Sequence, residues 1–264
     1  MTGALRVQSV PVRPSLREPI LTFLAAITLA SGLFWAGKAI PILQRNLHAC
    51  IAALFLYVPV VAGRLTGRPF DFYEAGLRLE PLRTNALVLT VAVVVTFPLF
   101  VLGFFAFYDV VCGSGLGTGA VARVVAPLCP GSGWQPSASA GGIADRAAHL
   151  RLPPTFALLS ANQLLVIALP EEMFFRGYLL GRLEDRWPSR HRFLGASVGR
   201  ALLVSAGLFA LGHFLVDFNS QRLAVFFPAL VFGWMRSRSG SVVPGAVYHA
   251  LCNLLADVLH TSYF

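Results

Sequence analysis

The sequence predicts an all-α protein, a polytopic bundle of helices that crosses a membrane several times. Hydrophobic residues make up 56% of the 264-residue chain and charged residues only 12%, whereas soluble domains carry about 25% charged residues. The long apolar segments lack the alternation of polar and apolar residues that marks a transmembrane β-barrel. We therefore expect residues 1–264 to form a single integral membrane domain.

Seven apolar segments have roughly the 17–25 residues that a transmembrane helix needs. They lie at residues 20–37, 47–63, 86–108, 154–180, 198–216, 222–236 and 241–260. The first resembles a signal peptide, but it is longer than the usual apolar core and no convincing small-residue cleavage site follows, so we interpret it as an uncleaved helix. One more short or re-entrant segment would make eight spans.

The arginines predict how the chain is oriented in the membrane. The formal net charge is +9, and most arginines fall in cytoplasmic segments if the N-terminus is cytoplasmic. These are Arg6, Arg13, Arg17, Arg64, Arg68, Arg78, Arg83, Arg182, Arg186, Arg190, Arg192, Arg200, Arg236 and Arg238. Such a bias is typical of loops that stay inside and contact anionic lipid. It predicts a multi-pass protein of the cell inner (plasma) membrane with its N-terminus inside, and no nucleic-acid partner is expected.

One long connection, at residues 112–153, is rich in Gly, Pro and Ser and is expected to be a flexible outer loop. Its glycine run is not followed by the Gly-Lys-Ser/Thr that a phosphate-binding loop requires. Cys112 and Cys129 both lie in this loop. Because an outer loop faces an oxidising compartment, these two residues can form a disulfide. No cysteine pair has the spacing of a zinc site.

The polar motifs lie in residues 154–260, the expected catalytic core, whereas residues 1–111 hold the first three spans and no motif. Glu171 and Glu172 stand side by side in an apolar segment, where a carboxylate costs about 3 kcal/mol at the bilayer centre. Glu172 and Arg176 are four residues apart and share a helix face, whereas Glu171 points about 100° away. Glu172 is therefore expected to pair with Arg176, which leaves Glu171 for a reactive partner.

Two further apolar segments each carry a histidine. His213 follows Phe209 by four residues and precedes Asp217 by four, and His249 precedes Asn253 by the same spacing. Counted from the arginines at the predicted cytoplasmic helix ends, both histidines and the glutamate pair lie at roughly 16–20 Å depth. This is near the middle of a hydrocarbon layer about 30 Å thick. A lone membrane histidine is usually a hydrogen-bond partner between helices, but the matched depth predicts a common site.

A carboxylate beside a histidine in a dry site can activate water. Glu171 with His213 fits that role, and His249 with Asn253 can donate hydrogen bonds to an oxyanion. Because no Ser or Cys is placed as a nucleophile, the implied reaction is peptide-bond hydrolysis without a covalent intermediate. Zinc is the rival, since two histidines and a glutamate suit it, but the chain lacks His-Glu-x-x-His and Arg176 would repel a cation. We therefore expect neither a metal nor any other cofactor.

Three motifs occur in order on successive segments: Glu171-Glu172-x-x-x-Arg176, Phe209-x-x-x-His213 and His249-x-x-x-Asn253. This arrangement resembles the CPBP family of CAAX-processing and bacteriocin-processing intramembrane endopeptidases, also called the Abi family. The phrases Glu-Glu-Met-Phe-Phe-Arg-Gly and Val-Pro-Gly-Ala-Val-Tyr-His-Ala-Leu-Cys-Asn are specific for it. The resemblance covers about residues 154–260.

The resemblance implies an all-helical, metal-independent, glutamic-type protease. By it, Glu171 is the base that acts with His213 on water, and Glu172 with Arg176 supports that base. The second histidine motif, with its asparagine, stabilises the oxyanion. The implied partner is a membrane-embedded protein or peptide substrate in the lipid bilayer.

Two positions are supporting candidates, Phe209 and Asp217. Asp217 departs from the family pattern, because prenyl-protein members often carry Asn there, and this puts a prenylated CAAX substrate in doubt. The alanine- and arginine-rich composition is typical of a high-GC bacterium, in which prenylated CAAX proteins are not expected. A sorting protease similar to the myxosortases, which cuts a C-terminal sorting signal, fits that setting.

Other functions remain open at this point. A non-catalytic membrane immunity or scaffold protein would tolerate alanine at Glu171 and His213. A CAAX-type prenyl-protein protease would use the same side chains on another substrate. A proton-coupled transporter also uses membrane Glu and His, but the hydropathy profile shows no paired inverted repeats.

Overall fold

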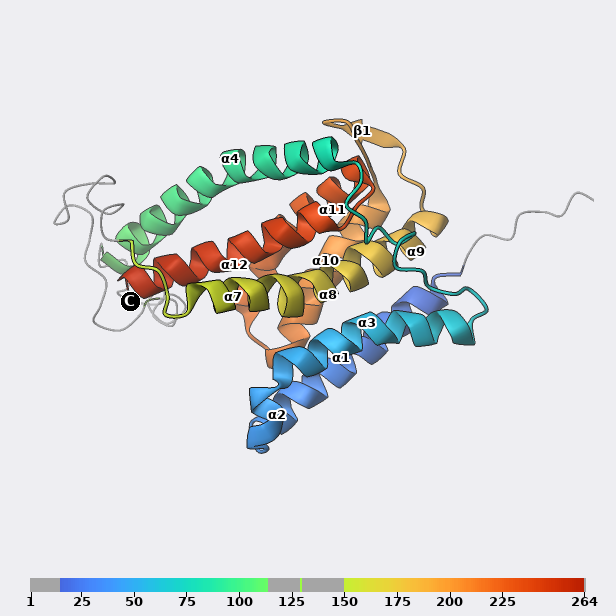
Figure 1. The fold of residues 1–264 in the computed structure, drawn as a ribbon, viewed down its shortest axis with the longest axis horizontal. Helices are drawn as coiled ribbons and strands as arrows, with labels where there is room; N and C mark the ends of the chain where they lie inside the picture. The colour runs from blue at the N-terminus through green and yellow to red at the C-terminus, as the bar shows by residue number, and fades with distance from the viewer. Residues whose placement is uncertain (1–14, 114–128, 130–149, 264) are drawn as a thin grey trace, which may run out of the picture.

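The computed structural model describes residues 15–113, 129 and 150–263, and most of them are helical. Figure 1 shows the helices packed side by side in a bundle. In chain order the elements are α1 (Arg17–Gly37), α2 (Pro41–Arg45), α3 (Leu47–Leu65), α4 (Leu82–Phe107), η1 (Tyr108–Gly113), α7 (Phe156–Asn162), η4 (Gln163–Ala168), α8 (Leu169–Glu172), η5 (Met173–Leu179), α9 (Leu180–Arg186), β1 (His191–Phe193), β2 (Ala196–Val198), α10 (Arg200–Asp217), η6 (Ser220–Val225), α11 (Phe226–Ser239) and α12 (Val243–Tyr263). The predicted all-α class is confirmed, and the short antiparallel hairpin β1–β2 was not predicted.

Five helical segments among the described residues are long and apolar enough to cross a membrane. They are Arg17–Gly37, Leu47–Leu65, Leu82–Val110, Phe156–Arg186 and Arg200–Asp217. These correspond to the first five predicted spans, although the fourth continues beyond residue 180. The predicted sixth span, 222–236, contains a 3-10 turn followed by α11, which has only 14 residues. The 21-residue helix α12 occupies the place of the seventh, but neither it nor α11 meets the same criteria of length and hydropathy.

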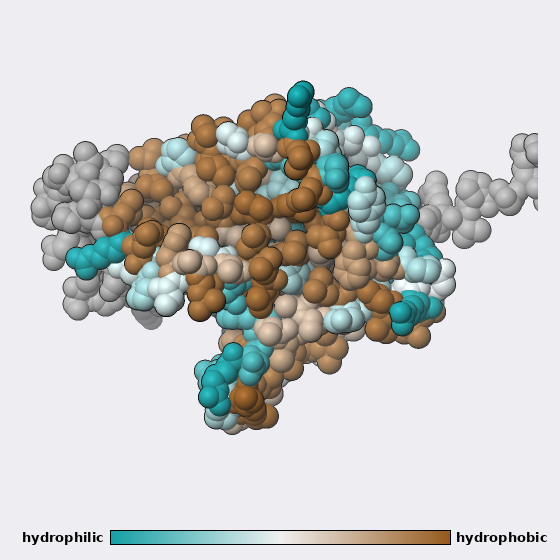
Figure 2. Space-filling view, in the orientation of Figure 1, coloured by the Kyte–Doolittle hydropathy of each residue, from teal (hydrophilic) through white to brown (hydrophobic). Residues whose placement is uncertain are grey.

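The outer face of α4 is apolar enough to be stabilised by lipid. The exposed fractions of Leu87, Val94 and Leu99 are 58%, 65% and 64%. In Figure 2 hydrophobic residues cover the middle of the visible face, over α4, α12 and α7, while hydrophilic residues gather toward its ends. Water disfavours an apolar surface of this extent, and a helix satisfies its own backbone hydrogen bonds in lipid. The chain is therefore a membrane protein.

The packed core surrounds the segment Met173–Leu179, all of whose residues are buried. The ring of Phe175 meets that of Phe209 in α10 edge to face, with centroids 4.9 Å apart. Phe55 in α3 stacks on Phe174 with centroids 5.0 Å apart. Aromatic pairs of this kind contribute about 1 kcal/mol each beyond the burial of their area. They fix the helix that carries the glutamate pair against its neighbours.

Charged groups from three segments meet at one end of the bundle. Glu18 in α1 pairs with Arg68 at 3.2 Å and with Arg182 in α9 at 3.1 Å. Arg68, in the connection between α3 and α4, also pairs with Asp185. The start of α1 and the end of α9 lie toward the right of Figure 1. Arginines of several predicted cytoplasmic segments thus share one end of the molecule. That this end faces the cytoplasm stays a prediction.

Candidate active site

The glutamate pair lies in α8, a single helical turn between two π-helical turns, η4 and η5. At the end of η4 the backbone N–H of Leu169 donates to the carbonyl of Leu164, five residues earlier. The next residue, Pro170, has no N–H and cannot donate to the helical ladder. The ladder is therefore irregular where the glutamates begin, and π-turns within α-helices are frequent at functional sites.

Glu172 is buried and holds two basic partners. Its Oε1 accepts a hydrogen bond from Nη1 of Arg176 at 3.0 Å and lies 3.3 Å from Nδ1 of His249. Arg176 is only 1% exposed, and its Nη2 donates to the carbonyl of Ala229 at 3.2 Å. The guanidinium carbon lies 4.2 Å from the centroid of the Phe209 ring, which adds a cation–π contact. A buried ion pair needs such additional hydrogen bonds to offset its desolvation.

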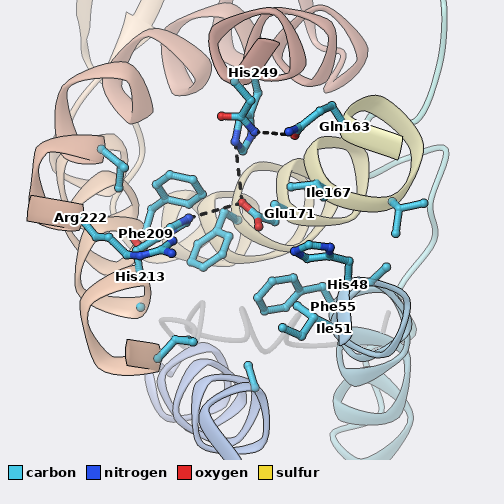
Figure 3. A pocket seen from close by; sticks show the side chains of 18 of the residues that line it. His48, Ile51, Phe55, Gln163, Ile167, Glu171, Phe209, His213, Arg222 and His249 are labelled. Carbon is cyan, nitrogen blue, oxygen red and sulfur yellow. Dashed lines mark hydrogen bonds and ion pairs between the residues drawn. The ribbon is translucent and has the colours of Figure 1, made fainter. Parts of the chain in front are cut away.

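Glu171 faces two histidines from other helices, as Figure 3 shows. Its Oε2 lies 3.7 Å from Nε2 of His213 in α10 and 3.9 Å from Nε2 of His249 in α12. Both separations exceed a direct hydrogen bond, and this oxygen is buried without a hydrogen-bond partner among the described residues. The structure thus brings these three predicted side chains together, and the two adjacent carboxylates have different surroundings.

The partners of each histidine determine which ring nitrogen carries hydrogen. Nδ1 of His213 lies 3.0 Å from the carbonyl oxygen of Phe209, and because a carbonyl only accepts, Nδ1 is the donor. Nδ1 of His249 likewise faces a carboxylate, that of Glu172, at 3.3 Å. When neutral, each ring therefore presents the lone pair of its Nε2 toward Glu171.

Phe209 and Phe232 hold the imidazole rings in place. The Phe209 ring lies 4.4 Å from the ring of His213 and 5.9 Å from that of His249, measured between centroids. The Phe232 ring stacks on His249 at 4.9 Å with an interplanar angle of 19°. Phe209, expected as a supporting residue, thus contacts both histidines.

Asn253 and Asp217, the remaining predicted residues, have partners of their own. Nδ2 of Asn253 donates to Oε1 of Gln163 at 3.0 Å. Asp217 lies at the end of α10, and its Oδ2 is 2.6 Å from Nε of Arg222. Asp217 therefore does not line the cavity itself but pairs with an arginine that does.

Residues 153–255 match the family model described as type II CAAX prenyl endopeptidase Rce1-like. We refer to this matched segment as the Rce1-like domain. The predicted resemblance to the CPBP family is confirmed for it, and it indicates an intramembrane endopeptidase, a hydrolase. No curated protein and no solved structure matches the chain. The similarity to myxosortases stays a prediction.

The Rce1-like domain supplies the polar side of a cavity of about 400 Å³. Glu171, both histidines and Asn253 line it, together with Gln163 and Arg222. The opposite side comes from α1 and α3, which lie outside the matched segment, and it is apolar apart from His48. In Figure 3 Ile51 and Phe55 of α3 lie across the cavity from Glu171.

Three polar residues that line the cavity belong to none of the sequence motifs: His48, Gln163 and Arg222. Residues 1–111 were expected to hold no motif, yet α3 brings His48 to the cavity. Gln163 stands in the same apolar segment as the glutamates, so its polarity was a usable signal. Arg222 lies in the short turn η6, where no sequence motif marks it.

Cys129 is disulfide-bonded, whereas Cys50 and Cys252 are free. The side chain of Cys112, its predicted partner, lies outside the described residues, as does most of the loop 112–153. Within the described part of the chain, no group of three or more His, Cys, Asp or Glu side chains is arranged to hold a metal ion.

Proposed function

We propose that the chain is a glutamic-type, metal-independent intramembrane endopeptidase. The Rce1-like domain supports proteolysis within a membrane. The observation that carries the mechanism is the position of Glu171, whose Oε2 lies 3.7 Å and 3.9 Å from the Nε2 atoms of His213 and His249. The enzyme would use water to hydrolyse a peptide bond of a membrane-associated protein or peptide.

In the resting site, Glu171 and the two histidines that face it are all acceptors. An ionised Glu171 accepts only, and the neutral rings of His213 and His249 offer lone pairs at Nε2. Water suits this set, because it offers two O–H donors and bridges groups that are too far apart for direct contact. A water that donates to Glu171 and His213 directs its own lone pairs away from both, which makes its oxygen the nucleophile.

The reaction then needs two proton transfers through one carboxylate. Glu171 takes a proton from the water as the water oxygen bonds to the carbonyl carbon of the scissile peptide. This gives a tetrahedral intermediate with one negative oxygen. The C–N bond breaks as the proton passes from Glu171 to the departing nitrogen. The products are a carboxylic acid and an amine, and Glu171 is ionised again.

Asn253 and His249 are the donors available for the negative oxygen of the intermediate. The amide nitrogen of Asn253 carries two hydrogens, and one of them already goes to Gln163. His249 donates from Nε2 only as an imidazolium, because its Nδ1–H faces Glu172. One donor in this role typically contributes about 10²- to 10³-fold in kcat.

The shape of the cavity favours an extended, apolar peptide segment as substrate. Its far side is built from apolar residues of α1 and α3, among them Ile27, Phe34, Ile51 and Phe55. A peptide bond within a regular helix has its carbonyl engaged by the ladder, so the substrate must be extended at the cleavage point. We further propose that the substrate is a protein processed at a C-terminal sorting signal, and that the enzyme lies in the inner membrane with its N-terminus inside.

The decisive experiment replaces the base. Glu171→Gln keeps the size of the side chain but removes the proton acceptor, and we expect it to abolish cleavage while the protein still inserts and accumulates. Glu74→Gln, which alters an exposed carboxylate in the connection before α4, is the matched control. The measurement compares the N- and C-terminal peptides of membrane proteins between cells that express equal amounts of each variant. Full cleavage by the Glu171 variant would show that the assigned base is wrong.

Two alternatives give different results in the same cells. A non-catalytic immunity or scaffold protein predicts that the terminal peptides are identical with and without Glu171→Gln. A CAAX-type prenyl-protein protease, which the description of the family model favours, predicts cleavage that requires a prenyl group on the substrate. Paired prenylated and unprenylated peptides distinguish that alternative from a sorting protease.

A further inference from the structure

A chain of three polar side chains runs from the cavity into the bundle. Nδ2 of Asn253 donates to Oε1 of Gln163 at 3.0 Å, and Nε2 of Gln163 donates to Oδ2 of Asp257 at 3.2 Å. Asn253 and Asp257 lie one turn apart on α12, and Gln163 reaches them from η4. All three side chains are at least partly buried.

We propose that Gln163 and Asp257 are positioning residues that set the orientation of the Asn253 amide. The proposal rests on the proposed function, in which that amide donates to the oxyanion. Neither residue belongs to a motif, and Asp257 lies beyond the matched segment 153–255.

The donor-to-acceptor direction of these two hydrogen bonds follows from the chemistry of the last side chain, Asp257. A carboxylate accepts hydrogen bonds and does not donate them. Asp257 therefore requires the amide nitrogen of Gln163, which turns the carbonyl oxygen of Gln163 toward Asn253. That oxygen in turn requires the amide nitrogen of Asn253. One partly buried charge thus decides which of two similar amide orientations is populated.

This orientation matters because only one end of an amide can donate. With Nδ2 of Asn253 held by Gln163, its second hydrogen remains free for the cavity, which Asn253 lines beside His249. With the amide reversed, the carbonyl oxygen would take that place and repel an oxyanion. Misplacing a group at the reacting centre can cost about 100-fold in rate.

The place of Gln163 in the fold supports this role. It is the first residue of the π-helical turn η4, and a π-turn changes the direction in which a side chain leaves the helix. The same turn ends next to α8, which carries Glu171. One irregular segment therefore sets both the base and, through Gln163, the oxyanion donor.

The first test breaks the hydrogen bond between Gln163 and Asp257 and then restores it with the amide and the carboxylate exchanged. The assay uses a synthetic peptide that spans a cleavage site lost in Glu171→Gln cells. Gln163→Glu places two carboxylates against each other and should lower kcat about 10- to 100-fold, because misplaced donors lose this much. In Gln163→Glu with Asp257→Asn, the new amide donates to the new carboxylate, whose other oxygen accepts from Asn253. We expect this double variant to recover most of kcat. Failure to recover would overturn the proposed direction of the hydrogen bonds.

The second test asks whether Gln163 acts through Asn253. Gln163→Leu should lower kcat with little change in KM, whereas Gln44→Leu on the exposed helix α2 serves as the control. In an Asn253→Ala background the same Gln163→Leu change should cost at most about twofold more, because residues in one network are not additive. Equal losses in both backgrounds, or a lower melting temperature with unchanged kcat, would mean that Gln163 is only structural.

Failure of this proposal can be told apart from failure of the proposed function. If Glu171→Gln leaves all cleavage intact, the proposed function is wrong and the positioning role falls with it. If that variant is inactive while Gln163→Leu keeps its kcat, only the positioning role is wrong.

Discussion

The helix that carries the glutamates and the N-terminal pair α1 and α3 face the same cavity but are built differently. Every residue from Met173 to Leu179 is buried, whereas in α3 only Phe55, Pro59 and Gly63 are. The first region is held by aromatic packing and a buried ion pair, and the second presents apolar side chains to both cavity and lipid. On the proposed function, the difference corresponds to a division of roles, in which the Rce1-like domain carries the chemistry and the N-terminal helices shape the space for substrate.

The largest effect is expected from breaking the buried ion pair. Arg176→Met leaves the Glu172 carboxylate without its guanidinium, and losing one partner of a buried pair costs about 3–5 kcal/mol. The change should also free His249 from its fixed orientation and remove activity. The measurement is the thermal or denaturant midpoint of unfolding in detergent, together with cleavage.

Arg68→Met provides the matched comparison at the charged end of the bundle. Arg68 pairs with two carboxylates, one more than Arg176, but its side chain is 38% exposed, and exposed pairs contribute about 0–1 kcal/mol. A loss of stability as large as that of Arg176→Met would remove the distinction between the two regions.

Several features of this site could be read from spacing alone. The i,i+4 relation of Glu172 and Arg176 predicts their shared face, and the structure pairs them at 3.0 Å. Counting depth along helices predicts that Glu171 meets the two histidines. These inferences succeed because the rise of a helix is nearly constant and because a charge at membrane depth needs a partner.

Other features depend on contacts between helices, which spacing within one helix does not specify. His249 and Asn253 are four residues apart, yet His249 bonds Glu172 and Asn253 bonds Gln163. The π-turns on either side of the glutamates, one of which begins at Gln163, follow no periodic pattern in the sequence. For the same reason, the contribution of α3 to the cavity could not be predicted, because no motif marks its apolar residues.

A smaller effect is expected from narrowing the cavity at its N-terminal side. Ile51 lines the cavity on α3, so Ile51→Trp should raise KM for bulky substrates by about 10-fold, the scale at which pockets discriminate by size. The catalytic groups are on other helices, so kcat should stay nearly unchanged. Val61→Trp is the control, because Val61 lies on the same helix but is 54% exposed. If kcat rather than KM falls, α3 takes part in the chemistry and the division of roles is wrong.

The smallest effect is expected from removing metal ions. If Glu171 and the two histidines activate water without zinc, then dialysis against EDTA and 1,10-phenanthroline should leave kcat and KM unchanged. The reason lies in the second carboxylate, since Glu172 is already engaged by Arg176 and His249, and a guanidinium this close repels a divalent cation. A known zinc protease in the same detergent is the control for chelation. Activity lost on chelation and restored by stoichiometric zinc, with metal content rising in parallel, would assign the histidines as ligands and transfer the activation of water from Glu171 to the metal.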